Sequence, residues 1–97
     1  MKAELREQIY TVIAAIPPGR VTTYGRIAAM TEATTPRLVA RALRELPADH
    51  DLPWFRVITA SRRLADHAGA WEQRERLTAE GVVFDARGRV PSDRLWP

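Results

Sequence analysis

The chain has 97 residues, of which 45% are hydrophobic, and this length suits one compact domain but not two. It contains no cysteine and only two histidines, which excludes disulfides, thiolate nucleophiles and cysteine-ligated zinc, so we expect neither a metal nor another cofactor. The net charge is +3, and all but one of the fifteen lysines and arginines are arginine, which is a weak indication of nucleic-acid binding.

The N-terminal segment has the pattern of an amphipathic helix. Leu5, Ile9 and Ile13 recur with other aliphatic residues at helical spacing, which predicts a helix over residues 3–15. The Pro17–Gly19 segment then ends it. No apolar block follows the charged first residues, and no stretch approaches the roughly 20 apolar residues of a membrane span. We therefore expect no signal peptide, no membrane partner and a cytoplasmic location.

Two shorter helices are predicted next, joined by a tight turn. Thr23 is a favourable N-cap for a helix over residues 24–30. Thr35 and Pro36 suit the N-cap and the first position of another helix, which runs to about Leu46. This pair predicts a helix-turn-helix.

One more helix is predicted in the second half of the chain. It covers residues 69–80, with Gly81 as its C-terminal stop and with Trp71 packing the helix. The other segments are a loop, an extended pair of residues, a basic loop and a terminal β-hairpin like the wing of winged helix-turn-helix domains. In chain order they are 47–53, Val57–Ile58, 61–63 and 82–90.

These elements predict a fold that is mainly α with short β elements, of winged helix-turn-helix type. We expect one domain over residues 1–90 and a C-terminal tail, 91–97, that contains Trp96 and is a candidate for disorder. No dimerisation helix is apparent beyond the first helix, which the core needs, so we expect a monomer.

The third predicted helix carries a stripe of arginines. At about 100° per residue, Arg37, Arg41 and Arg44 fall on one side. Like charges four residues apart repel each other, so the stripe favours a helix presented to phosphates or a groove. An ordinary solvated face explains this helix alone equally well, but its place as the second helix of the pair favours DNA binding. The opposite side is aliphatic and comprises Leu38, Val39, Ala42, Leu43 and Leu46.

Three segments at compatible spacing resemble the C-terminal domain of the O6-alkylguanine DNA alkyltransferases. They are residues 16–28 (IPPGRVTTYGRIA), 36–43 (PRLVARAL) and 53–58 (PWFRVI). The resemblance covers about residues 2–85 without a large insertion, and the third segment corresponds to the Pro-Cys-His-Arg-Val signature of the enzyme's active site. It implies the fold of that C-terminal domain.

In that family the helix-turn-helix enters the minor groove and turns a damaged guanine out of the stack. The resemblance implies that Tyr24 presses on the phosphate of the target nucleotide and that Arg37 fills the vacated space in the duplex. Packing of Tyr24 on the core is the alternative. Arg41 and Arg44 are assigned to phosphates from the stripe alone. The full set of predicted DNA contacts is Thr23, Tyr24, Arg26, Pro36, Arg37, Arg41 and Arg44.

The chemistry of the enzyme is not expected in this chain. The enzyme uses a thiolate that attacks the alkyl carbon, a histidine that accepts the thiol proton and a glutamate that orients the histidine. Trp54 stands at the position of the nucleophile and Phe55 at that of the histidine. Only the glutamate has a counterpart, Glu80, which is either solvated or paired with an arginine.

A Trp in place of the Cys is the mark of the alkyltransferase-like proteins. The resemblance implies that such proteins bind O6-alkylguanine in double-stranded DNA and flag it to nucleotide excision repair proteins without repairing it. Phe55 departs from their pattern, which usually keeps the histidine.

The lesion pocket is expected around the altered signature. Trp54 either lines it and stacks on the alkylated base or fills the volume left by the lost mechanism. Leu46 stands at the position of a hinge Asn, and Ala68 at that of a base-binding Ser, so main-chain groups would read the base. Arg62 and Arg63 would place a cation over the purine, meet phosphate or serve only as surface. The predicted lining is Trp54, Phe55, Arg56, Val57, Arg62, Arg63, Ala68 and Gly69.

Two other functions compete with that of a non-enzymatic lesion sensor. A sequence-specific winged-helix transcription regulator would use the same arginine helix in a major groove, but it gives no reason for the signature at residues 53–58, and such proteins are commonly dimers. An enzyme with new chemistry would use Glu80 as a base, but the sequence supplies no partner residue for it.

Overall fold

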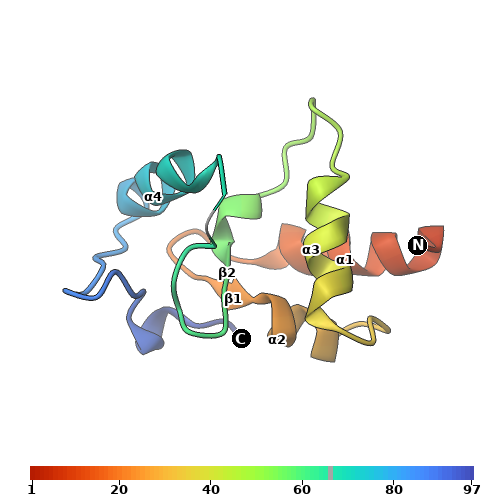
Figure 1. The fold of residues 1–97 in the computed structure, drawn as a ribbon, viewed down its shortest axis with the longest axis horizontal. Helices are drawn as coiled ribbons and strands as arrows, with labels where there is room; N and C mark the ends of the chain where they lie inside the picture. The colour runs from red at the N-terminus through yellow and green to blue at the C-terminus, as the bar shows by residue number, and fades with distance from the viewer. Residues whose placement is uncertain (66) are drawn as a thin grey trace.

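The computed structural model describes residues 1–65 and 67–97. Within these ranges helices predominate, and none of them is long and apolar enough to cross a membrane. The elements, of which η1 and η2 are 3-10 helices, follow in this order (Figure 1): α1 (Ala3–Ala15), β1 (Thr22–Thr23), α2 (Tyr24–Ala29), α3 (Pro36–Arg44), η1 (Trp54–Arg56), β2 (Val57–Ile58), α4 (Ala70–Ala79) and η2 (Ser92–Arg94).

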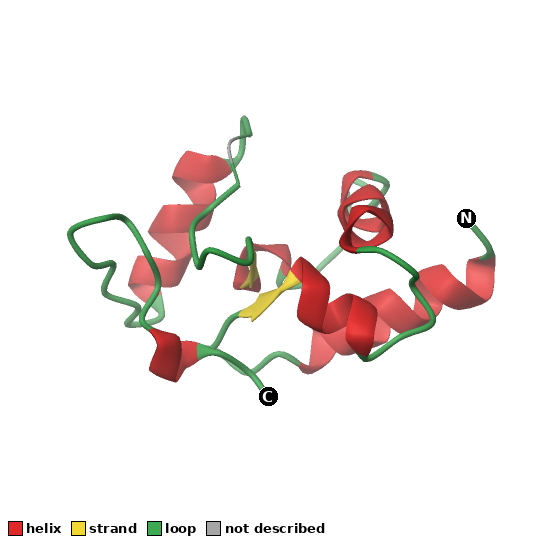
Figure 2. Ribbon diagram, turned by 60° about the horizontal axis from the view of Figure 1, so that its bottom comes forward, coloured by secondary structure: helices red, strands yellow, loops and turns green. Residues whose placement is uncertain are grey.

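A short parallel sheet lies at the centre, with α1, α2 and α3 on one side and α4 on the other (Figure 2). In it β1 pairs with β2, Thr22 beside Val57 and Thr23 beside Ile58. Successive strand residues point to opposite faces. Val57 accordingly packs in the hydrophobic cluster of the first three helices, whereas Ile58 packs in a second cluster beneath α4. The sheet thus joins two halves of the core.

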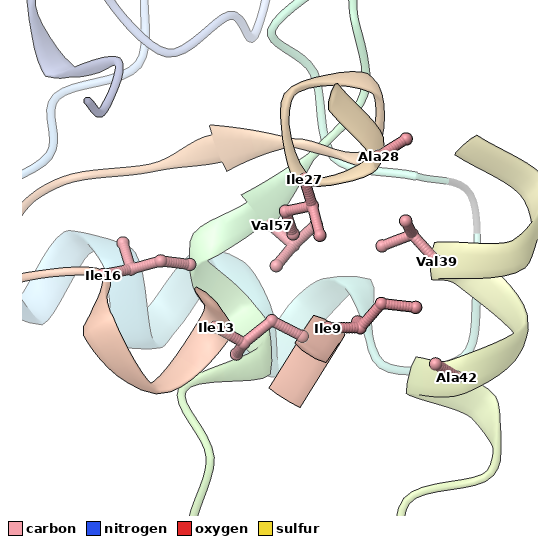
Figure 3. Close-up of a cluster of buried hydrophobic side chains, with 8 residues drawn as sticks. All are labelled: Ile9, Ile13, Ile16, Ile27, Ala28, Val39, Ala42 and Val57. Atoms are coloured by element: carbon pink, nitrogen blue, oxygen red, sulfur yellow. The ribbon is translucent and has the colours of Figure 1, made fainter. Parts of the chain in front are cut away.

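The first cluster forms where α1, α2 and α3 meet (Figure 3). Ile9 and Ile13 lie one turn apart on α1 and are fully buried, as the predicted amphipathic helix requires. The cluster consists of Ile9, Ile13, Ile16, Ile27, Ala28, Val39, Ala42 and Val57. The second cluster consists of Val21, Phe55, Ile58, Leu77, Val82 and Val90.

The two helices of the predicted helix-turn-helix are present, with small differences at their ends. The Thr23 hydroxyl accepts a hydrogen bond from the Arg26 N–H at 3.1 Å and so caps α2 as predicted. The Thr35 side chain makes no such bond, although Pro36 does open α3. The last helical residue of α3 is Arg44 and not Leu46, because the proline that follows Leu46 disfavours a helical backbone there.

The predicted β-hairpin at residues 82–90 is wrong. The structure describes this whole segment and assigns no strand to it. Asp85 closes a turn instead: its carboxylate accepts the N–H groups of Arg87 and Arg89 at 2.8 and 2.9 Å. Side-chain bonds of this kind compete with a strand ladder for the same backbone donors. The place of the wing is therefore taken by a loop with buried Val82 and Val90 at its ends.

Residues 91–97 pack on the domain. The Val21 N–H donates to the Arg94 carbonyl at 2.9 Å, and the Trp96 N–H donates to the Val21 carbonyl at 2.7 Å. The half-buried Trp96 side chain packs against the first cluster. The segment considered as a disordered tail thus runs beside β1 and covers the core.

The expected packing of Trp71 is also wrong, because its side chain is 73% exposed. The inner face of α4 belongs to Gln73 and Leu77, both of which are buried. At about 100° per residue, Trp71 lies on nearly the opposite side of the helix from Gln73.

Candidate nucleic-acid interface

The two predicted faces of α3 are confirmed. Val39 and Ala42 are fully buried, whereas Arg37, Arg41 and Arg44 are exposed. Arg41 forms an ion pair with Glu45, 3.3 Å from Nε to Oε2. Within the described part of the chain, no carboxylate pairs with Arg37 or Arg44. Two guanidinium groups on this helix are therefore available to an anionic partner.

Tyr24 lies between the core and the surface. Its ring packs against the first hydrophobic cluster, and its other side lines a pocket together with Arg44. Burial raises the pKa of the Tyr24 phenol above its ordinary value, and the positive charge of Arg44 acts in the opposite direction. The hydroxyl is therefore neutral and able to donate a hydrogen bond. The two alternatives for this side chain, core packing and a surface contact, are compatible.

The other predicted contacts flank the start of α2 and α3. Thr23 is buried and engaged in the cap of α2. Pro36 is exposed at the start of α3, where its Cγ would lie 3.9 Å from a Cβ added at Gly25. Arg26 is exposed and donates from Nη1 to the Pro97 carbonyl at 3.2 Å. Arg26 and Pro36 thus lie on the accessible surface, whereas Thr23 acts within the fold.

A pocket of about 710 Å³ opens between the C-terminal end of α3 and the N-terminal end of α4. Its wall is mostly apolar, and η1 and β2 contribute to it. Its described lining comprises Tyr24, Ala40, Leu43, Arg44, Leu46, Pro47, Ala48, His50, Trp54, Val57, Ala65, His67, Gly69 and Gln73.

The structure brings only some of the predicted pocket residues together. Trp54, Val57 and Gly69 line the pocket. Phe55 and Arg56 face a second, more polar hollow of about 430 Å³, which shares Ala48, His50 and Trp54 with the first. The remaining three line neither hollow, namely Arg62, Arg63 and Ala68.

Phe55 and Arg56 make contacts that hold the fold together. The Phe55 ring is buried in the second cluster, with the guanidinium carbons of Arg56 and Arg76 5.1 and 5.3 Å from its centroid. The Arg56 Nε lies 3.0 Å from a Glu80 carboxylate oxygen, and its Nη1 donates to the Ile16 carbonyl at 2.8 Å. Arg56 therefore ties the end of α1 to the end of α4.

Glu80 is paired with an arginine, one of the two alternatives for this residue. Its side chain and that of Arg56 are only 17% and 13% exposed, and it also accepts the Gly19 N–H at 3.0 Å. Burial raises the pKa of the Glu80 carboxyl, but the hydrogen bonds from Arg56 and Gly19 and the charge of Arg56 outweigh burial and leave the pKa below its ordinary value. Glu80 is therefore a charged structural anchor, a poor candidate for a base.

Arg62 and Arg63 form a turn away from the pocket. Arg62 has a positive φ of 65°, and its Nη1 donates to the Val90 carbonyl at 3.1 Å. Arg63 is exposed, and its backbone bonds to Thr59. This turn fastens the C-terminal loop and leaves the Arg63 side chain at the surface.

Sequence reasoning missed the histidines and the glutamine of the pocket wall. His50, His67 and Gln73 are polar residues of this wall, yet none belongs to the recognised signature. The sequence did contain an indication for Gln73. It precedes Leu77 by four residues and therefore lies on the same, inward face of α4. A polar residue at that position needs partners in the core. No group of three or more His, Cys, Asp or Glu in the described ranges could hold a metal ion.

Comparisons with known proteins place this fold in a family. A family model, 6-O-methylguanine DNA methyltransferase, DNA binding domain, matches residues 4–82. A DNA base-flipping protein of Vibrio parahaemolyticus is 40% identical over 87 residues, which are 86% of this chain and 85% of that protein. Alkyltransferase-like protein 1 of Schizosaccharomyces pombe is 34% identical over 83 residues, 81% of this chain and 77% of that protein.

Among solved structures, S. pombe Atl1 in complex with damaged DNA containing O6-carboxymethylguanine matches with a TM-score of 0.85 and 28% identity, over 100% of this chain and 98% of that chain. The family match contains all three segments on which the resemblance rests. The resemblance and the fold class are therefore confirmed. The chain belongs to the family of the 6-O-methylguanine DNA methyltransferase DNA-binding domain, among its alkyltransferase-like members.

Proposed function

We propose that this protein binds double-stranded DNA containing O6-alkylguanine, flips the damaged base into the pocket lined by Trp54 and flags it for nucleotide excision repair without removing the alkyl group. The observation that carries the proposal is the position of Trp54. An indole replaces the nucleophile of the family signature and lines an apolar pocket beside the arginine-bearing helix.

The surroundings of the pocket support recognition of a flipped base. Arg44 belongs both to the arginine stripe of α3 and to the pocket lining, so a bound phosphate backbone and the pocket are adjacent. Apolar walls suit an alkylated base, because stacking on an aromatic side chain stabilises a base by about 1–3 kcal/mol. A relative is named for base flipping, and another was solved with O6-carboxymethylguanine DNA.

The absence of alkyl transfer follows from the residues present. The chain has no cysteine, and neither Trp54 nor Phe55 can serve as a thiolate or accept its proton. The glutamate that would complete the relay is engaged by Arg56. Mass spectrometry of the protein after incubation with O6-methylguanine duplex should show an unchanged mass, and a gain of one methyl group would contradict this part of the proposal.

A fluorescence titration tests lesion recognition. Trp71→Phe removes the most exposed indole, so that Trp54 contributes more of the signal. Short duplexes with guanine or O6-methylguanine at one position are added in several flanking sequences. We expect tighter binding and quenching with the lesion, whatever its flanks. Equal affinity for both duplexes would overturn the proposal, and preference for one undamaged sequence would indicate a transcription regulator.

The link to nucleotide excision repair comes from the resemblance to alkyltransferase-like proteins. It predicts that the protein increases incision of an O6-methylguanine duplex by a purified bacterial excision nuclease. An undamaged duplex is the control. Unchanged incision in the presence of bound protein would remove the repair link but leave lesion binding intact.

A further inference from the structure

Gln73 is a buried polar residue, and both its amide nitrogen and its amide oxygen have hydrogen-bond partners in the protein. It is 1% exposed on the inner face of α4. Its Nε2 donates to the Phe55 carbonyl at 3.1 Å and to the Val57 carbonyl at 2.9 Å. Two acceptors on one side of the amide require its NH₂ group there, because an amide oxygen would be repelled. The Oε1 atom must then point the other way, and its partner at 3.1 Å is His67 Nε2.

The orientation of the Gln73 amide determines which ring nitrogen of His67 carries a hydrogen. Because Gln73 Oε1 can only accept, His67 Nε2 carries the hydrogen. The other ring nitrogen, Nδ1, accepts the Gly69 N–H at 2.9 Å and is therefore bare. This hydrogen-bond geometry favours the Nε2–H tautomer of the ring. A proton on Nδ1 would face the Gly69 N–H, donor against donor, at the positive end of α4.

The ring of His67 lies against the indole at the pocket wall. Its centroid is 6.2 Å from that of Trp54, with an interplanar angle of 70°. A Cβ added at Gly69 would come within 3.0 Å of His67 Cε1 and 3.4 Å of Trp54 Cη2. The first distance is tighter than most real Cβ contacts, so a side chain at residue 69 would push the His67 ring from this position by a few tenths of an ångström.

We propose that Gln73 is a positioning residue of the pocket. It holds His67 in the Nε2–H tautomer with its ring against Trp54, so that this wall is set before a base enters. Both ring nitrogens are engaged within the protein, and His67 therefore offers the base a ring surface and no hydrogen bond. Fixing the wall in the free protein lowers the ordering cost of binding. The predicted effect of Gln73 on lesion binding rests on the proposed function, whereas the hydrogen bonds that position His67 do not depend on it.

The tautomer can be measured without DNA. Long-range ¹H–¹⁵N spectra of the two histidine rings should show the Nε2–H form of His67 in the wild-type protein. Gln73→Met removes the acceptor of the Nε2 hydrogen, so the Nε2 and ring-proton signals of His67 should shift towards those of a ring with no protein partner at Nε2, while the Gly69 N–H still favours the same tautomer. His50 is the internal control: its Nδ1 accepts the Leu52 N–H at 3.1 Å, independently of Gln73, and its signals should not change. An Nδ1–H form of His67 in the wild type, or an unchanged His67 in the variant, would overturn the proposal.

Binding tests whether Gln73 acts through His67. Gln73→Met and His67→Ala should each weaken binding to an O6-methylguanine duplex about tenfold, as expected for lost stacking. Both should bind an undamaged duplex like the wild type. The double variant should lose no more than His67→Ala alone, because the two residues act as one unit. Additive losses, or full lesion affinity in His67→Ala, would contradict the proposal.

Two controls separate the possible failures. If the wild-type protein does not prefer the lesion, the proposed function fails. The tautomer measurement then still tests whether Gln73 positions the His67 ring. If the wild type prefers the lesion and Gln73→Met retains that preference, the inference fails alone. Circular dichroism establishes that each variant folds. His67→Ala leaves both bonds from Gln73 to the main chain intact, so it and the wild-type spectrum decide the question even if Gln73→Met unfolds.

Discussion

Three adjacent residues of the altered signature have three different environments. Trp54 lines the pocket, Phe55 enters the second hydrophobic cluster, and Arg56 pairs with Glu80. They form η1, a 3-10 helix with about three residues per turn, so each side chain points about 120° from the previous one. Residues next to each other in the signature therefore need not share its function.

At the same scale, Arg37 should be decisive for DNA binding. Arg37→Ala should weaken binding to a lesion duplex by about 1–3 kcal/mol, the range for a specific arginine contact. Arg87→Ala is a matched control, since it also removes an exposed arginine but lies in the C-terminal loop. Fluorescence anisotropy with labelled duplex measures both. Similar losses for the two variants would reduce the role of Arg37 to general charge.

The Arg56–Glu80 pair should stabilise the protein in a pH-dependent way. Glu80→Gln leaves the Arg56 charge poorly compensated and should lower the free energy of unfolding by roughly 3–5 kcal/mol at neutral pH. Because the folded-state pKa of Glu80 is lowered, its contribution is present above the ordinary value of 4.5 and is lost as pH falls through the lower folded-state value. Urea unfolding at neutral and acidic pH should show the two proteins converging in acid.

The surface pair of Arg41 and Glu45 provides the control for that experiment. Its side chains are 50% and 39% exposed, and exposed ion pairs contribute little to stability. Glu45→Gln should leave the urea midpoint nearly unchanged at neutral pH. Equal effects of Glu45→Gln and Glu80→Gln would contradict the importance of burial for the second pair.

At the scale of elements, the turn between α1 and β1 depends on Gly19. Its φ is +80°, and an added Cβ would lie 3.2 Å from Arg94 Nη1 and 3.3 Å from the Glu80 carbonyl oxygen. Gly19→Ala therefore combines an unfavourable backbone with crowding and should cost more than the roughly 1–2 kcal/mol of a left-handed residue. The Tm measured by circular dichroism reports the loss.

Gly88 separates the two causes. Its φ is +75°, but an added Cβ meets nothing within 4 Å. Gly88→Ala should thus show the backbone cost alone and a smaller drop in Tm than Gly19→Ala. Equal drops would mean that the close approach to Arg94 and Glu80 is relieved without cost.

At the scale of the whole molecule, the core has two clusters, and the last residues of the chain help to hold them together. Val21 belongs to the second cluster, while its backbone bonds to Trp96, whose ring covers the first. Residues 91–97 thus pack on the domain, joined to Val21, the residue before β1, by hydrogen bonds of both Arg94 and Trp96.

This role predicts that two tryptophans differ in their contribution to stability. Trp96→Ala should lower the free energy of unfolding by up to about 1.5–3 kcal/mol, the value for burying a large apolar side chain. Trp71→Ala should have almost no effect, because that ring is 73% exposed. Urea unfolding compares them, and an equal loss in both variants would contradict the assigned packing.

The amino-acid sequence by itself determined the helices, the arginine stripe and the family. Periodicity and capping are local properties, so α1, the cap of α2 and the two faces of α3 follow from residues within one or two turns. That the chain contains no cysteine is likewise visible without a structure. The boundary of α3 was placed two residues too late, because a helical pattern does not reveal where the following proline ends the helix.

Only the tertiary structure decided where the side chains of residues 54–56 lie and which residues surround them. Phe55 and Arg56 lie outside the pocket that was predicted to include them, because their partners, such as Glu80, come from the far end of α4. His67 and Gln73 line the pocket, although the sequence did not predict this, because the start of α4 lies against η1 and β2. Contacts between segments so far apart depend on the packing of the whole chain, and no local pattern encodes them. Trp54 and a pocket around it were predicted from the sequence, but most of the residues that line this pocket were not.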